Sequence, residues 1–162
     1  MEAKKILLVD DDQDVLSIAE TILNHEGFIT ITAGSEKAGF DKVSIEKPNL
    51  AILDVMMTTH FEGFNLARKI IDAYPNMPII IQSSIDVMSV TDTDVIQLAK
   101  EYRKKAADQH LDVLLIENTD AEIAGIDYLN ESGVSVWIPV KAFIPKPINP
   151  QKLIATVKKF IK

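Results

Sequence analysis

The sequence contains no cysteine, which excludes disulfide bonds and thiolate metal sites and is typical of proteins from a reducing compartment. Its three histidines (His25, His60 and His110) are scattered, so they give no pattern for a zinc site. No apolar run approaches the roughly 20 residues of a membrane-spanning helix, and the apolar run after Lys4 is too short for a signal peptide. We therefore expect a cytoplasmic protein that does not associate with membranes.

Positive charge is also scarce, with 17 Lys and Arg against 24 Asp and Glu and a net charge of −7. This balance disfavours nonspecific binding to nucleic acid or to an anionic membrane. The apolar fraction of 47% is ordinary for a globular protein with a real core. A length of 162 residues indicates one domain, or one domain with a large insertion.

Short apolar runs alternate with helical patterns along most of the chain. Continuous apolar runs at 5–9, 50–53 and 78–81 predict strands buried on both faces, and residues 28–33 are rich in Ile and Thr. Helices are predicted after Asp12, after Ser35 and from Gly63, and a short strand at 142–144 precedes a last helix that starts at Pro150. Strand and helix in alternation predict an α/β fold with a parallel, doubly wound sheet.

The stretch from Ile85 to Lys141 is less regular. Apolar residues from Val95 to Ala106 mark one face of a helix, and residues 134–140 look extended. Residues 111–116 predict a strand, although such a short run also permits a helix. The capping-box spacing of Thr119 and Glu122 predicts a further helix that carries Ile123, Ile126 and Leu129 and stops at Gly133.

Polar side chains stand at the ends of the predicted parallel strands. They are Asp10 and Asp11, Asp54, Ser83, and Lys146. Because the carboxyl ends of parallel strands meet at one edge of a sheet, we expect these groups to converge. Three carboxylates with a backbone carbonyl and water make an oxygen site that suits Mg²⁺, and a carboxylate beside Mg²⁺ can act as a nucleophile. A hydroxyl and an ammonium opposite could each hold a phosphoryl oxygen.

Each of these residues also has a purely structural interpretation. Asp12 is expected to cap the first helix rather than bind metal, and a helix dipole could stabilise Asp10 and Asp11. Ser83 alone would be an ordinary loop hydroxyl, and Lys146 alone a solvated loop lysine. Only their convergence favours a functional site.

The motifs KILLVDDD, AILDVMM, PIIIQSS and PKP occur in the order typical of one family. With them the chain resembles the receiver domain of two-component response regulators. The resemblance covers Lys4 to about Ile85 and Trp137 to Lys162, and it implies a five-stranded, flavodoxin-like sheet. Residues 1–162 would form a single receiver domain, with residues 85–141 as an enlarged segment inserted before the last core strand.

The resemblance also implies roles for the residues at the sheet edge. Asp54 would be the phosphoacceptor, and Asp10, Asp11, Asp54 and the backbone carbonyl of Met56 would hold Mg²⁺. Ser83 would track the phosphoryl group, with Lys146 as its cationic partner.

Two further roles concern the segment next to Lys146. Pro147 would follow a cis peptide bond. Phe143 would be an aromatic switch that acts together with Ser83, although plain core packing is an equal alternative for this ring.

The chain departs from the family in two places. Thr58 stands where the family has a proline, and the loop from Asp54 to Gly63 is one residue longer, which puts the rate of phosphorylation in question. In addition, 63 positions separate Ser83 from Lys146, and residues 85–141 hold 11 acidic and 5 basic residues. This segment is either a solvated decoration or an acidic docking surface for a partner, in a region where many receivers form homodimers.

We therefore expect a stand-alone response regulator that takes a phosphoryl group on Asp54 from a histidine kinase in a Mg²⁺-dependent reaction and signals through phosphorylation-dependent protein binding. It would not be an enzyme in the usual sense. One alternative is a degenerate receiver that binds partners without phosphorylation. Another is a Mg²⁺-dependent phosphohydrolase with an aspartyl nucleophile, which generally needs a second Asp where this chain has Met56.

Overall fold

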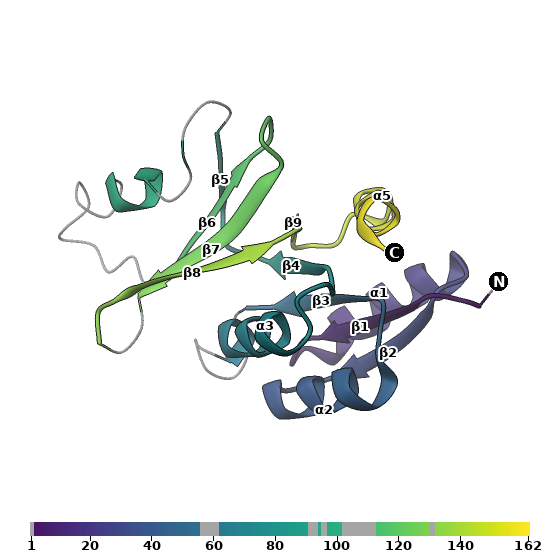
Figure 1. The fold of residues 1–162 in the computed structure, drawn as a ribbon. Coiled ribbons are helices and arrows are strands. Elements are labelled where there is room, and N and C mark those ends of the chain that lie inside the picture. The colour runs from purple at the N-terminus through teal and green to yellow at the C-terminus, as the bar shows by residue number, and fades with distance from the viewer. Residues whose placement is uncertain (1, 56–61, 91–93, 95–96, 102–112, 130–131) are drawn as a thin grey trace. The chain divides into compact units, whose positions relative to one another are not determined.

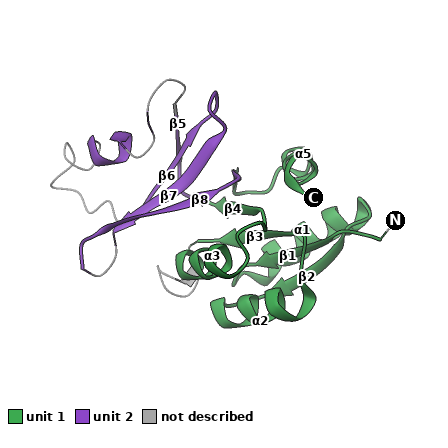
Figure 2. Ribbon diagram, in the orientation of Figure 1, with its two compact units in different colours: residues 1–84, 144–162 green, residues 85–143 purple. Residues whose placement is uncertain are grey.

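The computed structural model describes residues 2–55, 62–90, 94, 97–101, 113–129 and 132–162 (Figure 1). The chain forms two compact units (Figure 2). The first unit contains residues 1–84 and 144–162, and the second contains residues 85–143. No helix in the described part of the chain has both the length and the apolar character needed to cross a membrane.

A five-stranded parallel sheet forms the centre of the first unit, as the sequence predicts. Its strands are β1 (Lys5–Val9), β2 (Ile29–Ala33), β3 (Leu50–Asp54), β4 (Ile79–Ser83) and β9 (Ala142–Pro145), in the order β2-β1-β3-β4-β9. Every residue of β3 and β4 is buried, which explains their continuous apolar runs. The order reverses at β1, so the carboxyl ends of β1 and β3 lie side by side at the switch point where ligands bind in such sheets.

The described residues of this unit form four helices: α1 (Gln13–His25), α2 (Glu36–Glu46), α3 (Glu62–Ala73) and α5 (Pro150–Phe160). The predicted caps are confirmed, because the side chain of Asp12 accepts hydrogen bonds at the start of α1 and that of Ser35 does so at the start of α2. Pro150 occupies the first turn of α5 as expected. Gly27 follows α1 with a φ of 93°, a conformation that favours glycine.

The helices pack in two pairs. An ion pair between Lys158 and Glu26 joins α5 to α1, and one between Lys69 and Glu36 joins α3 to α2. Successive side chains of β1 meet different helices, since Leu8 lies near Leu16 of α1 while the Val9 side chain packs near α2. This alternation is the period of a strand that is buried on both faces.

The second unit is built on a four-stranded mixed sheet in the order β5-β6-β7-β8. The strands are β5 (Val87–Val90), β6 (Val113–Asn118), β7 (Ile123–Leu129) and β8 (Ser135–Val140). β5 runs parallel to β6, whereas β6, β7 and β8 are antiparallel neighbours. Residues 97–101 are helical, and Ala99 packs there in a cluster with Leu114 and Ile116. The other residues of the predicted helix over 95–106 lie outside the described residues.

The prediction of a helix that starts at Thr119 and Glu122 is wrong, because residues 123–129 form strand β7. Asn118 pairs with Ile123, so the residues between them are the turn of a β-hairpin. The Asn118 side chain accepts a hydrogen bond from the Ala121 backbone at 3.1 Å, and Glu122 has a φ of 54°. Pairing with strands on both sides decides the conformation, and the sequence spacing of Thr119 and Glu122 does not reveal those strands.

Gly125 of β7 lies under the indole ring of Trp137 on β8, and a methyl group at this position would overlap the ring. We expect Gly125→Ala to lower the free energy of unfolding by about 1–3 kcal/mol, because the ring must move out of its packed position. Urea denaturation followed by Trp137 fluorescence measures this, since the chain has one tryptophan. Gly34→Ala is the matched control, because its new methyl group would have its nearest neighbour 3.8 Å away. Equal losses in the two variants would contradict the prediction.

Candidate functional site

Two buried carboxylates stand next to each other at the carboxyl edge of the first sheet. Asp10 directly follows β1, and Asp54 is the last residue of β3. Val9 and Leu53 are register partners in these neighbouring parallel strands, so the next residues, Asp10 and Asp54, also lie side by side. Each of the two aspartates is only 4% exposed. Two anions in such a position require compensation by positive charge or by hydrogen-bond donors.

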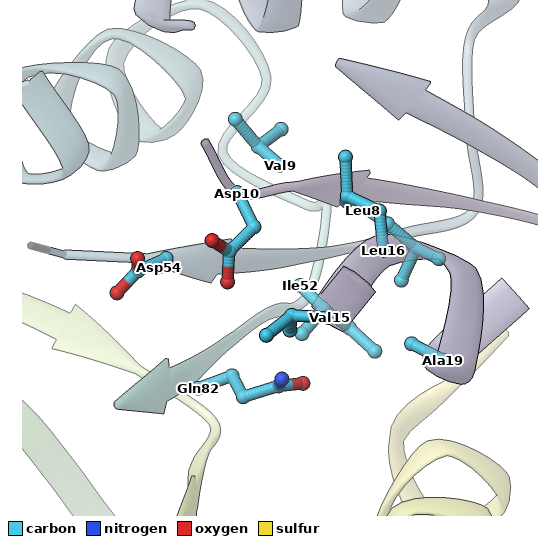
Figure 3. A pocket seen from close by; sticks show the side chains of 9 residues that line it. All are labelled: Leu8, Val9, Asp10, Val15, Leu16, Ala19, Ile52, Asp54 and Gln82. Atoms are coloured by element: carbon cyan, nitrogen blue, oxygen red, sulfur yellow. The ribbon is translucent and has the colours of Figure 1, made fainter. Parts of the chain in front are cut away.

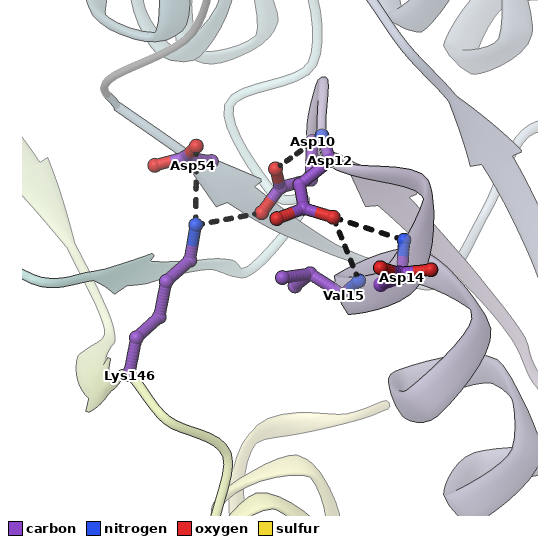
Figure 4. A network of polar contacts seen from close by, with 6 residues as sticks. All are labelled: Asp10, Asp12, Asp14, Val15, Asp54 and Lys146. Carbon is purple, nitrogen blue, oxygen red and sulfur yellow. Dashed lines mark hydrogen bonds and ion pairs between the residues drawn. The ribbon is translucent and has the colours of Figure 1, made fainter.

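Lys146, which directly follows β9, provides this compensation (Figure 4). Its Nζ lies 2.8 Å from Oδ2 of Asp10 and 3.2 Å from Oδ2 of Asp54. Burial alone would lower the pKa of Lys146, but the hydrogen bond to Asp10 and the charges of Asp54 and Asp10 outweigh it, so the pKa is raised. The ammonium is therefore charged at neutral pH and binds both carboxylates at once.

Asp11 adds a third carboxylate to this pair. One oxygen each from Asp10, Asp11 and Asp54 lie within 4.8 Å of one another, and Asp11 is exposed while the other two are buried. Three carboxylates and the ammonium of Lys146 together have a net charge of −2. One divalent cation would neutralise this charge. Grouped carboxylate oxygens are the ligands that Mg²⁺ accepts, so these residues fit such an ion.

The loop between β1 and α1 orients Asp10 and starts the helix at the same time (Figure 4). Oδ1 of Asp10 accepts a hydrogen bond from the backbone of Asp12 at 2.9 Å, which leaves Oδ2 for Lys146. Oδ1 of Asp12 in turn accepts hydrogen bonds from the backbones of Asp14 and Val15. Asp12 thus acts as the helix cap, and its neighbours Asp10 and Asp11 are presented to the site.

The remaining predicted residues divide into three groups. Ser83 is buried at the end of β4, and its backbone carbonyl accepts a hydrogen bond from the Lys146 backbone at 3.0 Å. The Lys146–Pro147 peptide bond is cis, and Phe143 is a buried residue of β9. Met56 and Thr58 lie outside the described residues.

Two further residues, whose place at the site the sequence patterns do not indicate, lie next to Asp54. At Gly63, in the first turn of α3, a methyl group would overlap the backbone of Asp54 and Val55, so only glycine permits this close approach. Gln82 is the register partner of Asp54 and is 3% exposed. A buried glutamine directly after the apolar run of β4 is the signal that could have identified it.

Comparison with known families and sequences gives one consistent result. The model of the response regulator receiver domain family matches residues 6–112. The alkaline phosphatase synthesis transcriptional regulatory protein PhoP of Bacillus subtilis is 30% identical over 83 residues, which are 51% of this chain and 34% of PhoP. The transcriptional regulatory protein GlrR of Escherichia coli is 34% identical over 121 residues, which are 72% of this chain and 27% of GlrR. The chain thus spans about a third or less of these relatives.

Solved structures agree on the fold. A response regulator receiver domain protein (CheY-like) from Methanospirillum hungatei matches with a TM-score of 0.61 and 23% identity, over 98% of this chain and 93% of that one. A two-component response regulator from Clostridium difficile matches with a TM-score of 0.60 and 20% identity, over 97% and 94% of the two chains. At these identities the likeness concerns the fold alone.

Removal of the Lys146 ammonium would leave the carboxylates of Asp10 and Asp54 buried without their cation. We expect Lys146→Met to lower the free energy of unfolding by about 3 kcal/mol in metal-free buffer, the loss typical of a broken buried ion pair. Chemical denaturation at neutral pH measures it. Lys158→Met is the matched control, because its exposed ion pair with Glu26 is worth at most about 1 kcal/mol. Equal stability of wild type and Lys146→Met would contradict this prediction.

The raised pKa of Lys146 also predicts a pH dependence. A cation whose pKa is higher in the folded state stabilises the fold fully below its unfolded pKa, about 10.4 for lysine, and loses this effect as pH rises through the folded value. The difference in stability between wild type and Lys146→Met should therefore stay constant from neutral pH to about pH 10 and shrink above it. Denaturation curves across this range test the sign, and a difference that grows with pH would refute the interpretation.

Proposed function

The chain belongs to the response regulator receiver domain family, and we propose that it accepts a phosphoryl group on Asp54 from a histidine kinase in a Mg²⁺-dependent reaction. One observation carries this proposal: oxygens of Asp10, Asp11 and Asp54 lie within 4.8 Å of one another, and the Lys146 ammonium contacts two of the three carboxylates. Receivers generally act as phosphoacceptors rather than as enzymes.

In the proposed reaction, an oxygen of the Asp54 carboxylate attacks the phosphorus atom of a phosphohistidine. The new oxygen–phosphorus bond forms as the bond from phosphorus to the histidine nitrogen breaks, and the imidazole leaves. Burial of Asp54 keeps the nucleophile poorly hydrated, and its place at the strand end leaves the edge of the sheet as the direction of approach.

Asp10 and Asp11, together with Asp54 and the Met56 carbonyl, are the proposed ligands of Mg²⁺. When bound, the ion would neutralise negative charge on the phosphoryl oxygens. The Asp12 backbone, as donor to Oδ1 of Asp10, holds that carboxylate in position from the side of α1.

Lys146 and Ser83 are the proposed partners of the phosphoryl oxygens. The ammonium of Lys146 already contacts Asp54 at 3.2 Å, so a group attached to this carboxylate lies within its reach. The Ser83 hydroxyl would bind an oxygen of the phosphoryl group. The hydrogen bond from the Lys146 backbone N–H to the Ser83 carbonyl holds the two residues next to each other. Phe143, on the strand that precedes Lys146, would transmit the change as a switch.

The output of the proposed switch is binding to another protein. The segment 85–141 carries 11 acidic and 5 basic residues, which favours a basic partner surface. Exposed acids of this segment include Asp86, Glu101 and Asp120. A variant with Asp86→Lys, Glu101→Lys and Asp120→Lys should bind the partner more weakly and still be phosphorylated. Unchanged partner binding would show that the segment is not the docking surface.

The first test of the proposal is the intact mass after incubation with acetyl phosphate and Mg²⁺. We expect wild type to gain one phosphoryl group, and we expect Asp54→Asn to gain none because the amide is not a nucleophile. The adduct should fail to form in EDTA. Asp41→Asn, which changes an exposed aspartate of α2, is the matched control and should behave as wild type does.

Other outcomes would point elsewhere. A folded wild type without an adduct would favour the receiver that binds partners without phosphorylation. Free phosphate released over many turnovers would instead indicate a hydrolase.

A second test concerns Asp11, the exposed member of the carboxylate group. Asp11→Asn removes one negative charge from the proposed metal site, so we expect Mg²⁺ affinity to fall at least about tenfold, the range seen when residues around a metal are changed. Isothermal titration calorimetry measures the affinity. Asp14→Asn, in the first turn of α1, is the control. Equal affinity in wild type and Asp11→Asn would remove this residue from the proposed ligand set.

A further inference from the structure

Gln82 is a buried amide whose role the proposed phosphoryl transfer does not explain. Its side chain is 3% exposed, and within the described part of the chain no hydrogen bond reaches its carboxamide. A buried amide without a partner costs free energy, so it requires an explanation.

The sheet register places Gln82 in one row with the two buried carboxylates. Asp54 is its register partner on β3, and Asp10 follows Val9, the register partner of Leu53, on β1. Paired residues of parallel strands direct their side chains to the same face of the sheet, so all three residues share the face that α1 covers. In the view of Figure 3, Val15 of α1 lies between the Asp10 carboxylate and the Gln82 side chain.

A small cavity lies between this row and the first turns of α1 (Figure 3). Its polar lining residues are Asp10, Asp54 and Gln82, and α1 contributes Val15, Leu16 and Ala19. Its volume of about 10 Å³ is close to the lower limit, roughly 10–15 Å³, at which a cavity accepts one water molecule. Polar partners and adequate volume are the two conditions for an internal water.

We propose that this cavity is an internal water site, in which one water molecule joins the Gln82 carboxamide to a carboxylate of the Asp10 and Asp54 pair. The water donates one hydrogen bond to the carboxylate and one to the amide oxygen, or accepts one from the amide nitrogen. Gln82 is then a positioning residue, because it restrains the carboxylate from the side opposite the exposed edge. The effect of this restraint on Mg²⁺ rests on the proposed function, whereas the water site itself does not.

Two variants remove the water in different ways. Gln82→Met removes the polar partner at nearly constant length, and Val15→Ile fills the cavity while Gln82 remains. Gln13→Met is the matched control, because it replaces glutamine by methionine as Gln82→Met does, but at an exposed position of α1.

Crystal structures at a resolution that shows internal water should reveal one molecule hydrogen-bonded to Gln82 in wild type and none in Gln82→Met or Val15→Ile. Calorimetric titration should show Mg²⁺ affinity about tenfold lower in both variants, as for residues that orient metal ligands, and unchanged in Gln13→Met.

A dry cavity in wild type would overturn the water site. Water in wild type together with unchanged Mg²⁺ affinity in Gln82→Met and Val15→Ile would overturn the positioning role. Failure of wild type to bind Mg²⁺ would count against the proposed function instead, and the crystal structures would still decide the water site.

Discussion

The contact of one ammonium group with two buried carboxylates is the interaction on which the rest of the site depends. Asp10 and Asp54 follow neighbouring strands and are almost completely buried, so their charges would repel each other without a cation between them. Nζ of Lys146 lies within 3.2 Å of both. This lysine directly follows β9, so the two carboxylates receive their cation only when β9 has joined the sheet. The charge that remains after this compensation suits one divalent cation.

The segments next to this edge of the sheet, the turn after β1 and the first turn of α3, also pack closely against the site. The turn after β1 serves Asp10 and the cap of α1 at once, because Asp12 donates to Asp10 through its backbone and caps the helix with its side chain. Gly63 brings the first turn of α3 against the backbone of Asp54, where a side chain would overlap. The positions of the Asp10, Asp11 and Asp54 carboxylates therefore depend on the ends of several helices and strands. Small shifts of these ends should change the distances between the carboxylates.

The second unit, residues 85–143, begins after β4 and ends within β9, and β4 and β9 are neighbours in the first sheet. Ser83 and Lys146 are 63 positions apart in the sequence, yet their backbones share a hydrogen bond. A parallel sheet tolerates such an insertion because any crossover must leave the sheet and return to it. Residues 85–141 hold 11 acidic and 5 basic residues, so most of the chain's net charge of −7 lies in this segment.

The sequence by itself determined the alternation of strands and helices in the first unit, the caps at Asp12 and Ser35, and the set of polar residues at the strand ends. These follow from local patterns: continuous apolar runs, helical spacing and residues that bind their own backbone. Only the tertiary structure decided that residues 123–129 are a strand, because the strands that pair with them lie elsewhere in the chain. It also decided that Lys146 reaches two carboxylates and that Gln82 shares a row with Asp54. Register and distance depend on contacts between distant residues, and local sequence patterns do not contain them.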